Sequence, residues 1–391
     1  MKKTLSLATT LSFTLFLLLF AMLFWVLPDR SFSEIENRSL TTVPRFSWKR
    51  LISGDFADEV NDYFADQFPC RDRFVAGKGL ASLALGAGGN DGVLLGRDGQ
   101  LATYLFDTRL ANGTKMSDVD AFDSAQIRAA GEAITRVGAR LDVPFSVLLT
   151  GRTLDVCASA FDYPLDASDA LLDAMRASVG DTVSYIDTVP LLREKYDAGE
   201  YVYYKTDHHW TTLGAYYAYR EVLISFGMEN DILPPEAFSQ ETVAQDFYGT
   251  AWSAGGMRFV SPDSLTLWLR GNEDSFSVVA DGKELEGFYS LRYLWGKDKY
   301  SVFLDGTHDV VTVRKKDGEA RETLLIFKDS FANAIAPFLA QHFDLVLCNL
   351  SSSRTDFTDV TSRAAGYSAD RVLLLYTLEN VITADRLGRL R

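Results

Sequence analysis

The sequence is poor in histidine, cysteine and basic residues. Of its 391 residues only four are histidine and three are cysteine, and 39 lysines and arginines stand against 53 aspartates and glutamates, a net charge of −14. A phosphate backbone requires dense Lys and Arg, but no basic run here is longer than Lys315-Lys316. Nucleic acid is therefore excluded as the main partner.

The scarcity of cysteine excludes a disulfide scaffold. Cys70, Cys157 and Cys348 lie far apart and match no metal or redox spacing. One pair could form a bridge in an oxidising compartment, but so few cysteines indicate small buried side chains in a fold that does not depend on bridges. With 47% hydrophobic and 24% charged residues, the chain is globular rather than disordered.

Charge is missing altogether from the 25 residues Thr4 to Pro28. A helix of this length spans about 30 Å of hydrocarbon. Lys2 and Lys3 before it place the N-terminus in the cytoplasm by the positive-inside preference. No small-x-small cleavage site follows the run, which favours an uncleaved single-pass anchor over a signal peptide. We therefore expect residues 29–391, with 37 basic and 53 acidic residues and a net charge of −16, outside the cytoplasm at the cell membrane.

Composition predicts five segments along the chain. A cytoplasmic stub with the anchor (1–28) is followed by a membrane-proximal segment (29–85). An α/β domain follows in two parts (86–258 and 323–391), with a β-rich insertion (259–322) between them. The membrane-proximal segment is polar with scattered aromatics, and one short helix is predicted there near 56–64. The stretch 96–99, between the apolar residues 93–95 and Leu101, is typical of a hairpin turn. It is not a phosphate loop, because it has neither the Lys-Ser/Thr ending nor a following helix.

Strand and helix patterns alternate through both α/β parts. An amphipathic helix is predicted where apolar residues recur at spacings of three and four, at Ile127, Ala130, Ile134, Val137 and Leu141. Short apolar runs predict strands at 145–149, 183–186, 324–327, 345–348 and 372–375, and helices are predicted near 171–175, 212–226 and 331–342. The alternation implies an α/β fold with a mostly parallel sheet covered on both faces. Residues 259–322, with short alternating runs between Gly-containing turns, form the antiparallel β-rich insertion.

Two stretches carry the residue types of a catalytic site where strands of a parallel sheet end. Asp207-His208-His209 contains two of the four histidines, and in an extended segment Asp207 and His209 point to one side while His208 points away. Ser330 follows the strand at 324–327 and precedes a helix, whose dipole is positive at that end. Ser330, His209 and Asp207 can therefore supply a nucleophile, its general base and the group that orients the base.

Each of these residues also has a structural interpretation. A serine before a helix is commonly an N-cap, and a buried Asp-His pair is commonly structural. A metal site on Asp207-His208-His209 lacks Cys and Glu partners at ligand spacing, so we expect neither a metal nor a cofactor. His308 and His342 are expected to be incidental.

The motifs carry a family resemblance. Thr206-Asp207-His208-His209-Trp210-Thr211, followed by Gly214-Ala215-Tyr216-Tyr217, resembles the signature of the DHHW protein family. That family is similar to the SGNH-hydrolase-like polysaccharide O-acetyltransferases of the alginate type, which have an Asp-x-His-Trp motif upstream of an Asp-Ser-Phe nucleophile motif. Asp329-Ser330-Phe331 stands in that order here. Further stretches agree at 33–38, 66–71, 247–250 and 328–333, so the resemblance runs from about residue 33 to residue 380.

The resemblance implies a three-layer α/β/α fold of the SGNH-hydrolase type, with the motif order circularly permuted. It assigns Ser330 as the nucleophile, His209 as the general base and Asp207 as its partner. Lys328 stands where SGNH hydrolases have glycine, and the glycine and asparagine blocks of their oxyanion hole are not recognisable in this sequence. Residues that could contact the oxyanion or the substrate are Gly249, Asn333 and Arg354.

The resemblance also implies an activity. The exported domain is expected to transfer acetyl groups to an exported polysaccharide through an acyl-serine. Because acetyl-CoA is cytoplasmic, a membrane-bound O-acyltransferase is implied as the partner that passes acetyl groups outward. Two alternatives stay open: an esterase that removes acetyl groups with the same triad, and a non-catalytic scaffold or glycan-binding protein of the same fold.

Overall fold

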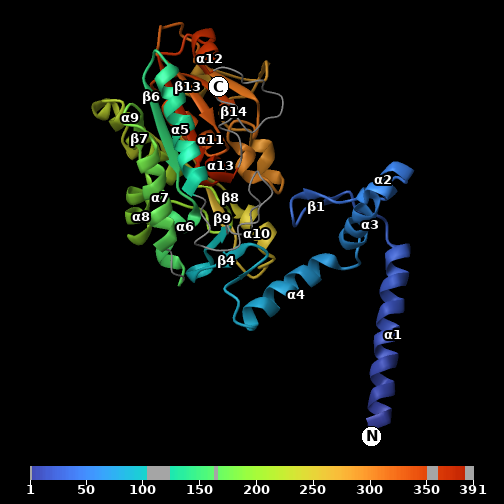
Figure 1. Cartoon of the computed structure of the whole chain (residues 1–391). Helices are drawn as coiled ribbons and strands as arrows, with labels where there is room; N and C mark the ends of the chain where they lie inside the picture. The colour runs from blue at the N-terminus through green and yellow to red at the C-terminus, as the bar shows by residue number, and fades with distance from the viewer. Residues whose placement is uncertain (1, 104–123, 163–165, 350–359, 384–391) are drawn as a thin grey trace. The chain divides into compact units, whose positions relative to one another are not determined.

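The structure is a computed structural model that describes residues 2–103, 124–162, 166–349 and 360–383 (Figure 1). The chain forms two compact units. The N-terminal unit consists of residues 1–90 and 256–258, and the main unit consists of residues 91–255 and 259–391.

The N-terminal unit begins with the apolar helix that the sequence predicts. Within α1 (Lys2–Val26), the residues Leu7–Val26 are long and apolar enough to cross a membrane. The predicted membrane-proximal helix is α3 (Asp55–Asp66). The other elements of this unit are β1 (Phe32–Ser33), β2 (Arg38–Ser39), α2 (Trp48–Ser53), α4 (Arg71–Ala84) and β3 (Gly89–Asn90).

Two stretches of the family resemblance, 33–38 and 66–71, meet in the N-terminal unit. Arg38 donates to Glu36 at 2.7 Å and to Asp66 at 3.0 Å, and Arg71 donates to Glu36 as well. The backbone N–H of Thr41 donates to Asp66 at 2.8 Å. Hydrogen bonding from Arg38 holds the pKa of Asp66 below its ordinary value despite burial. These stretches therefore tie the chain that follows α1 to the end of α3.

The main unit is built on a sheet with eight strands in the described part of the chain. In its middle, β13 (Thr323–Lys328) lies between β14 (Asp344–Asn349) and β15 (Arg371–Thr377), parallel to both. Beyond β15 the parallel sheet continues with β6 (Phe145–Thr150) and β7 (Ser184–Ile186). Since the chain goes from β13 to β14 on one side and returns to β15 on the other, the carboxyl end of β13 is a topological switch point, where open sheets leave a crevice.

Helices cover both faces of this sheet, because successive residues of each buried strand point to opposite sides. Leu324 and Ile326 belong to one hydrophobic core, whereas Leu325 and Phe327 belong to the other. The first core is covered by α6 (Thr153–Val156), α8 (Val189–Asp197), α9 (Thr212–Ser225) and α11 (Ala332–Leu339). The second core is covered by α5 (Ser124–Arg140), α7 (Asp166–Ser178), α12 (Val360–Gly366) and α13 (Leu378–Thr383). The predicted three-layer α/β/α fold is confirmed.

The β-rich segment 259–322 does not stand apart from the sheet. Its strands β12 (Val310–Lys315), β10 (Phe276–Ala280) and β11 (Lys283–Glu284) extend the sheet beyond β14, each antiparallel to its neighbour. Its first strand, β9 (Asp263–Leu269), instead pairs with β8 (Ser239–Phe247), a strand that the sequence analysis did not predict. The segment therefore contributes the antiparallel edge strands of the central sheet and one strand of the separate β8–β9 pair.

The remaining elements of the main unit are short. The predicted hairpin is present, with β4 (Val93–Leu95) antiparallel to β5 (Leu101–Thr103) and positive φ angles at Asp98 and Gly99 in the turn. A further helix, α10 (Thr250–Gly255), follows β8. All three cysteines are free; Cys157 and Cys348 are buried as expected, but Cys70 is exposed, so the expectation of burial is wrong for that residue.

Candidate active site

The Asp207-His208-His209 motif lies on a closed loop in front of α9. Tyr203 and Trp210 form an isolated antiparallel bridge, and the N–H of Tyr204 donates to the carbonyl of His209 at 3.2 Å. The Thr211 side chain then accepts the N–H of Gly214 at 3.2 Å, which caps α9. The Tyr203–Trp210 bridge and the Tyr204–His209 hydrogen bond hold the two ends of the loop together, so the motif lies at the tip of the loop.

Ser330 lies at the switch point, in the turn between β13 and α11. The turn is fixed from both sides: Asp329 accepts the N–H groups of Phe331 at 3.1 Å and Thr377 at 2.7 Å. Trp210 donates its indole N–H to the carbonyl of Phe331 at 3.2 Å. The tryptophan that ends the DHHW motif thus ties the histidine loop to the residue that follows the serine.

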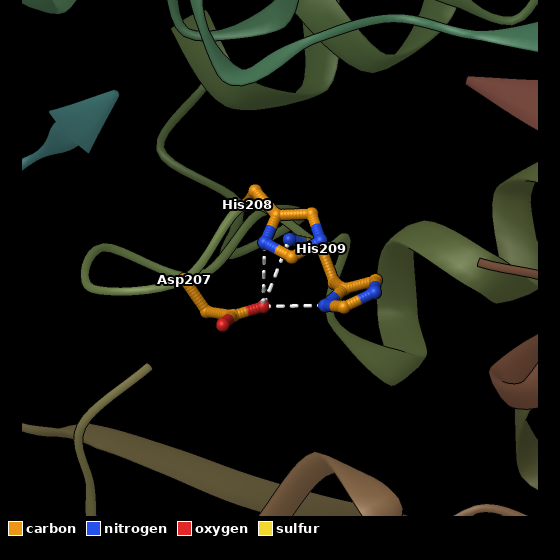
Figure 2. A group of neighbouring side chains, drawn as sticks. All are labelled: Asp207, His208 and His209. Carbon is orange, nitrogen blue, oxygen red and sulfur yellow. Dashed lines mark hydrogen bonds and ion pairs between the residues drawn. The ribbon is translucent and has the colours of Figure 1, made fainter. Parts of the chain in front are cut away.

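The structure brings the three residues singled out from the sequence into one hydrogen-bonded row. The Nε2 atom of His209 lies 2.6 Å from the Oγ of Ser330. The Nδ1 atom of the same ring lies 2.5 Å from an oxygen of Asp207, and Figure 2 shows this pair. Asp207 and His209 are buried, while Ser330 is partly exposed. A hydroxyl, an imidazole and a carboxylate in this order have the geometry of a nucleophile, a general base and an orienting acid.

Asp207 is held as a carboxylate by donors on both of its oxygens. One oxygen accepts the backbone N–H of His209 at 3.1 Å. The other accepts the N–H and the hydroxyl of Thr250 at 2.9 and 2.7 Å. Burial raises the pKa of Asp207, but the imidazoles of His208 and His209 and the backbone N–H of Thr250 outweigh burial and hold it well below its ordinary value. Asp207 therefore stays ionised throughout the neutral range.

The prediction that His208 points away from Asp207 is wrong. Residues 205–209 bend sharply instead of being extended, so the Nδ1 of His208 comes within 3.8 Å of Asp207 and its ring within 3.9 Å of the His209 ring (Figure 2). His208 is partly exposed, and its Nδ1 lies 3.0 Å from the Thr250 hydroxyl. A strict alternation of side chains applies only to a pleated strand.

The three side chains could also be considered as metal ligands. Asp207, His208 and His209 offer ligand atoms within 4.8 Å of one another. Both ring nitrogens of His209, however, already face hydrogen-bonding partners, Asp207 and Ser330, so a metal ion would have to break one of these bonds. The donor set fits a hydrogen-bonded row better than a metal centre.

Gly249 lies against Asp207 where a side chain would collide with it. A Cβ at this position would be 2.2 Å from the Cβ of Asp207. Gly249→Ala is therefore expected to displace Asp207, lowering the free energy of unfolding by about 1–3 kcal/mol and any activity of the site with it. Thermal unfolding measures the first effect. Gly366→Ala, at a helical glycine with open space around it, is the control, and equal losses in both variants would contradict this account.

The other residues offered for the oxyanion or substrate are placed differently. The N–H of Gly249 donates to the hydroxyl of Thr206 at 3.0 Å. The side chain of Asn333 is buried, donates to the carbonyl of Gly306 at 3.0 Å and accepts from Lys328 at 2.6 Å. Both groups thus have partners within the protein. Arg354 lies outside the described residues.

Lys328, which by the motif resemblance replaces a glycine, is the last residue of β13 and is not among the residues with positive φ. Its side chain is fully buried, and burial lowers the pKa of its ammonium group to about 8. The ammonium bonds Asn333, which follows Ser330 by three residues. Lys328 therefore helps to stabilise the turn that carries Ser330, through its hydrogen bond to Asn333.

Two supporting residues were missed by the sequence analysis. Thr250 belongs to a stretch of the family resemblance, so its motif could have indicated it. Asp263, at the start of β9, accepts the N–H groups of Lys205 and Thr206, both at 2.8 Å, and fixes the first residues of the loop. Nothing in the local sequence marks this aspartate, because its partners are 57 and 58 residues away.

Comparison with known proteins supports the family resemblance of the motifs. The model of the DHHW protein family matches residues 170–348, which include the loop and Ser330. None of the curated proteins compared with the chain matches it.

The chain is similar to several solved structures. A DHHW family protein from Eubacterium siraeum has a TM-score of 0.57 at 19% identity, covering 77% of this chain and 98% of that one. PatB1 from Bacillus cereus, solved with a sulfonyl adduct, has a TM-score of 0.60 at 18% identity, covering 76% and 97%. The O-acetyltransferase domain of Pseudomonas putida AlgJ has a TM-score of 0.44 at 15% identity, covering 76% and 99%. The chain therefore shares its fold with the DHHW protein and PatB1, and the resemblance to the DHHW protein family predicted from its motifs is confirmed over residues 170–348.

Proposed function

We propose that this protein is a serine acyltransferase that transfers acetyl groups to an exported polysaccharide. The observation that carries the proposal is the contact of 2.6 Å between the Ser330 hydroxyl and the Nε2 of His209, with Asp207 on the other ring nitrogen. A serine hydroxyl is a weak nucleophile unless a base removes its proton. The row of three residues provides that base and fixes its orientation.

The first step forms an acetyl-enzyme. His209 accepts the proton of Ser330 as the Oγ attacks the carbonyl carbon of an acetyl ester or thioester. The bond to the donor breaks, and the leaving oxygen or sulfur takes the proton from His209. The ionised Asp207 stabilises the imidazolium that exists between these two proton transfers.

Negative charge develops on the carbonyl oxygen during this step. The turn that carries Ser330 leads directly into α11, whose N-terminal end is positive, and the backbone N–H of Ser330 belongs to that turn. We assign the stabilisation of the oxyanion to this N–H and the start of α11. Neither the N–H of Gly249 nor the side chain of Asn333 is assigned this role, since both bond protein groups.

The second step passes the acetyl group to the acceptor. A sugar hydroxyl gives its proton to His209 and attacks the carbonyl carbon of the acetyl-serine. The bond between that carbon and the Oγ of Ser330 breaks, and His209 returns the proton to the Oγ, which releases the O-acetylated glycan and restores Ser330. The resemblance of both motifs to polysaccharide O-acetyltransferases of the alginate type supports a polysaccharide as the acceptor. The sulfonyl adduct of PatB1, which shares the fold, is consistent with a reactive nucleophile in such proteins.

The apolar helix α1 supports a place at the membrane. We propose that it anchors the chain as a single span, with Lys2 and Lys3 in the cytoplasm and the main unit outside. Acetyl groups would then reach the site from a membrane-bound O-acyltransferase.

The test is to supply the full chain in detergent with an activated acetyl ester, with and without an oligosaccharide acceptor. We expect acetylated oligosaccharide, detected by mass spectrometry, and faster ester consumption when the acceptor is present. If the ester were consumed at the same rate with and without the acceptor, and free acetate were the only product, the protein would instead be an esterase. No consumption at all would favour a non-catalytic scaffold.

A further inference from the structure

A buried tyrosine lies flat on the proposed general base. The ring of Tyr300, in the 3₁₀ helix η9 (Lys299–Val302), stacks on the imidazole of His209 with 3.7 Å between centroids and 9° between planes. Tyr300 comes from the β-rich segment, 91 residues after His209 in sequence, and no motif marks it. It is only 5% exposed, and its ring is packed against Tyr204 and Phe303. The stack is therefore a fixed feature of the core of the main unit.

The geometry of the stack favours one charge state of His209. Two neutral aromatic rings prefer an offset or edge-on arrangement with centroids about 4.5–7 Å apart, because their faces are both electron-rich. Centroids 3.7 Å apart in nearly parallel planes leave little offset. A cation above the face of tyrosine is attracted by the same electron density, most strongly where water is excluded. The stack therefore suits an imidazolium better than a neutral imidazole.

We propose that Tyr300 is a positioning residue that stabilises the protonated form of His209 during acyl transfer. The inference rests on the proposed function, in which His209 holds a proton between its removal from Ser330 and its delivery to the leaving group. Stabilisation that exists only in this state accelerates the reaction.

Other groups face His209 and act on the same equilibrium. Asp207 at its Nδ1 favours the cation, whereas His208, whose ring lies 3.9 Å away on the same loop, opposes it when protonated. Ser330 faces the Nε2 from the β13–α11 turn. Tyr300 differs from all three because burial raises its pKa well above the ordinary value, so its ring stays neutral.

The ring of Tyr300, and not its hydroxyl, is the part that acts. The hydroxyl is buried and has no hydrogen-bond partner among the described residues. Removing it leaves the stacked face in place and relieves an unsatisfied buried group. Tyr300→Phe is therefore the conservative variant, and Tyr300→Leu removes the aromatic face while keeping an apolar side chain.

The experiment is an NMR titration of the full chain in detergent, with its histidines isotopically labelled. The chemical shifts of the carbon-bound imidazole protons of His209 are measured as the pH is varied. His209→Gln identifies the signal among the four histidines, and a His208→Asn background removes the neighbouring titration. In Tyr300→Leu we expect the midpoint of the His209 titration to fall by about 0.5–1 pH unit. Acetyl transfer should fall about tenfold, with the acid limb of its pH profile moved to lower pH. Tyr300→Phe should keep the wild-type midpoint and restore most of the rate.

The two readouts separate failure of the inference from failure of the proposed function. A midpoint in Tyr300→Leu equal to that of the wild type overturns the role of Tyr300, whatever the activity. The same midpoint shift in a protein with no acyl transfer would support the stacking effect and count against the function. If Tyr300→Leu does not fold, Tyr300→Met is used in its place. The inference is also overturned if the midpoint of the His209 titration is as low in Tyr300→Phe as in Tyr300→Leu.

Discussion

Replacing Ser330 with alanine is expected to reduce turnover of an activated acetyl ester by about 10³-fold or more. The substitution removes the hydroxyl that attacks the acyl carbonyl in the proposed mechanism. It should not lower the melting temperature, because Ser330 is partly exposed and, within the described residues, its side chain hydrogen-bonds His209 alone. Initial rates with a chromogenic ester, measured on the full chain in detergent, give the size of the loss.

Ser277→Ala is the matched control for this substitution. Ser277 lies on β10 of the same sheet, and its hydroxyl donates only weakly to Glu284, at 3.5 Å. Wild-type rates are expected in this variant. If Ser330→Ala retained more than a tenth of the wild-type rate, Ser330 could not be the nucleophile.

Asp207→Asn is expected to lower the rate of acyl transfer by about 10²–10⁴-fold with little loss of folded protein. The carboxylate accepts four hydrogen bonds, including one from the Nδ1 of His209 at 2.5 Å. An amide accepts through one oxygen only, so it either loses the donors of Thr250 or turns its NH₂ group toward His209. In the second arrangement the Nε2 carries the proton and cannot accept one from Ser330.

A second Asp–His pair in the main unit provides the control. Asp281 lies 3.1 Å from the Nδ1 of His308 and has backbone donors of its own, but neither residue contacts the triad in the described structure. Asp281→Asn should change stability without changing the rate constant. An Asp207→Asn variant as active as wild type would reduce Asp207 to a structural residue.

The sequence was informative where local pattern decides structure. Buried parallel strands are continuous apolar runs, so the strands at 324–327 and 345–348 were predicted to within one or two residues of β13 and β14. A serine between such a strand and a helix necessarily lies at the carboxyl edge of the sheet. This rule, together with the scarcity of histidine, was sufficient to select Ser330, His209 and Asp207.

The parts that were missed depend on contacts between distant segments. Apolar and polar residues alternate in the edge strands β10–β12, as in any antiparallel strand. This pattern does not indicate whether the strands join the central sheet or form a separate sheet. The loop at 205–209 bends because Asp263 and Thr250, both more than 40 residues away, bond its backbone and side chains. Tyr300 reaches His209 only through the same tertiary packing.

The most direct test of the central claim is to locate the acetyl group on the protein. The full chain is mixed briefly with an activated acetyl ester, acid-quenched, and analysed by intact mass and peptide mapping, alongside Ser330→Ala and His209→Ala. We predict a gain of one acetyl group on the peptide that contains Ser330, absent in Ser330→Ala and strongly reduced in His209→Ala. An acetyl group on another residue that persists in Ser330→Ala, or ester turnover with no acetyl-enzyme in any variant, would contradict the proposed mechanism.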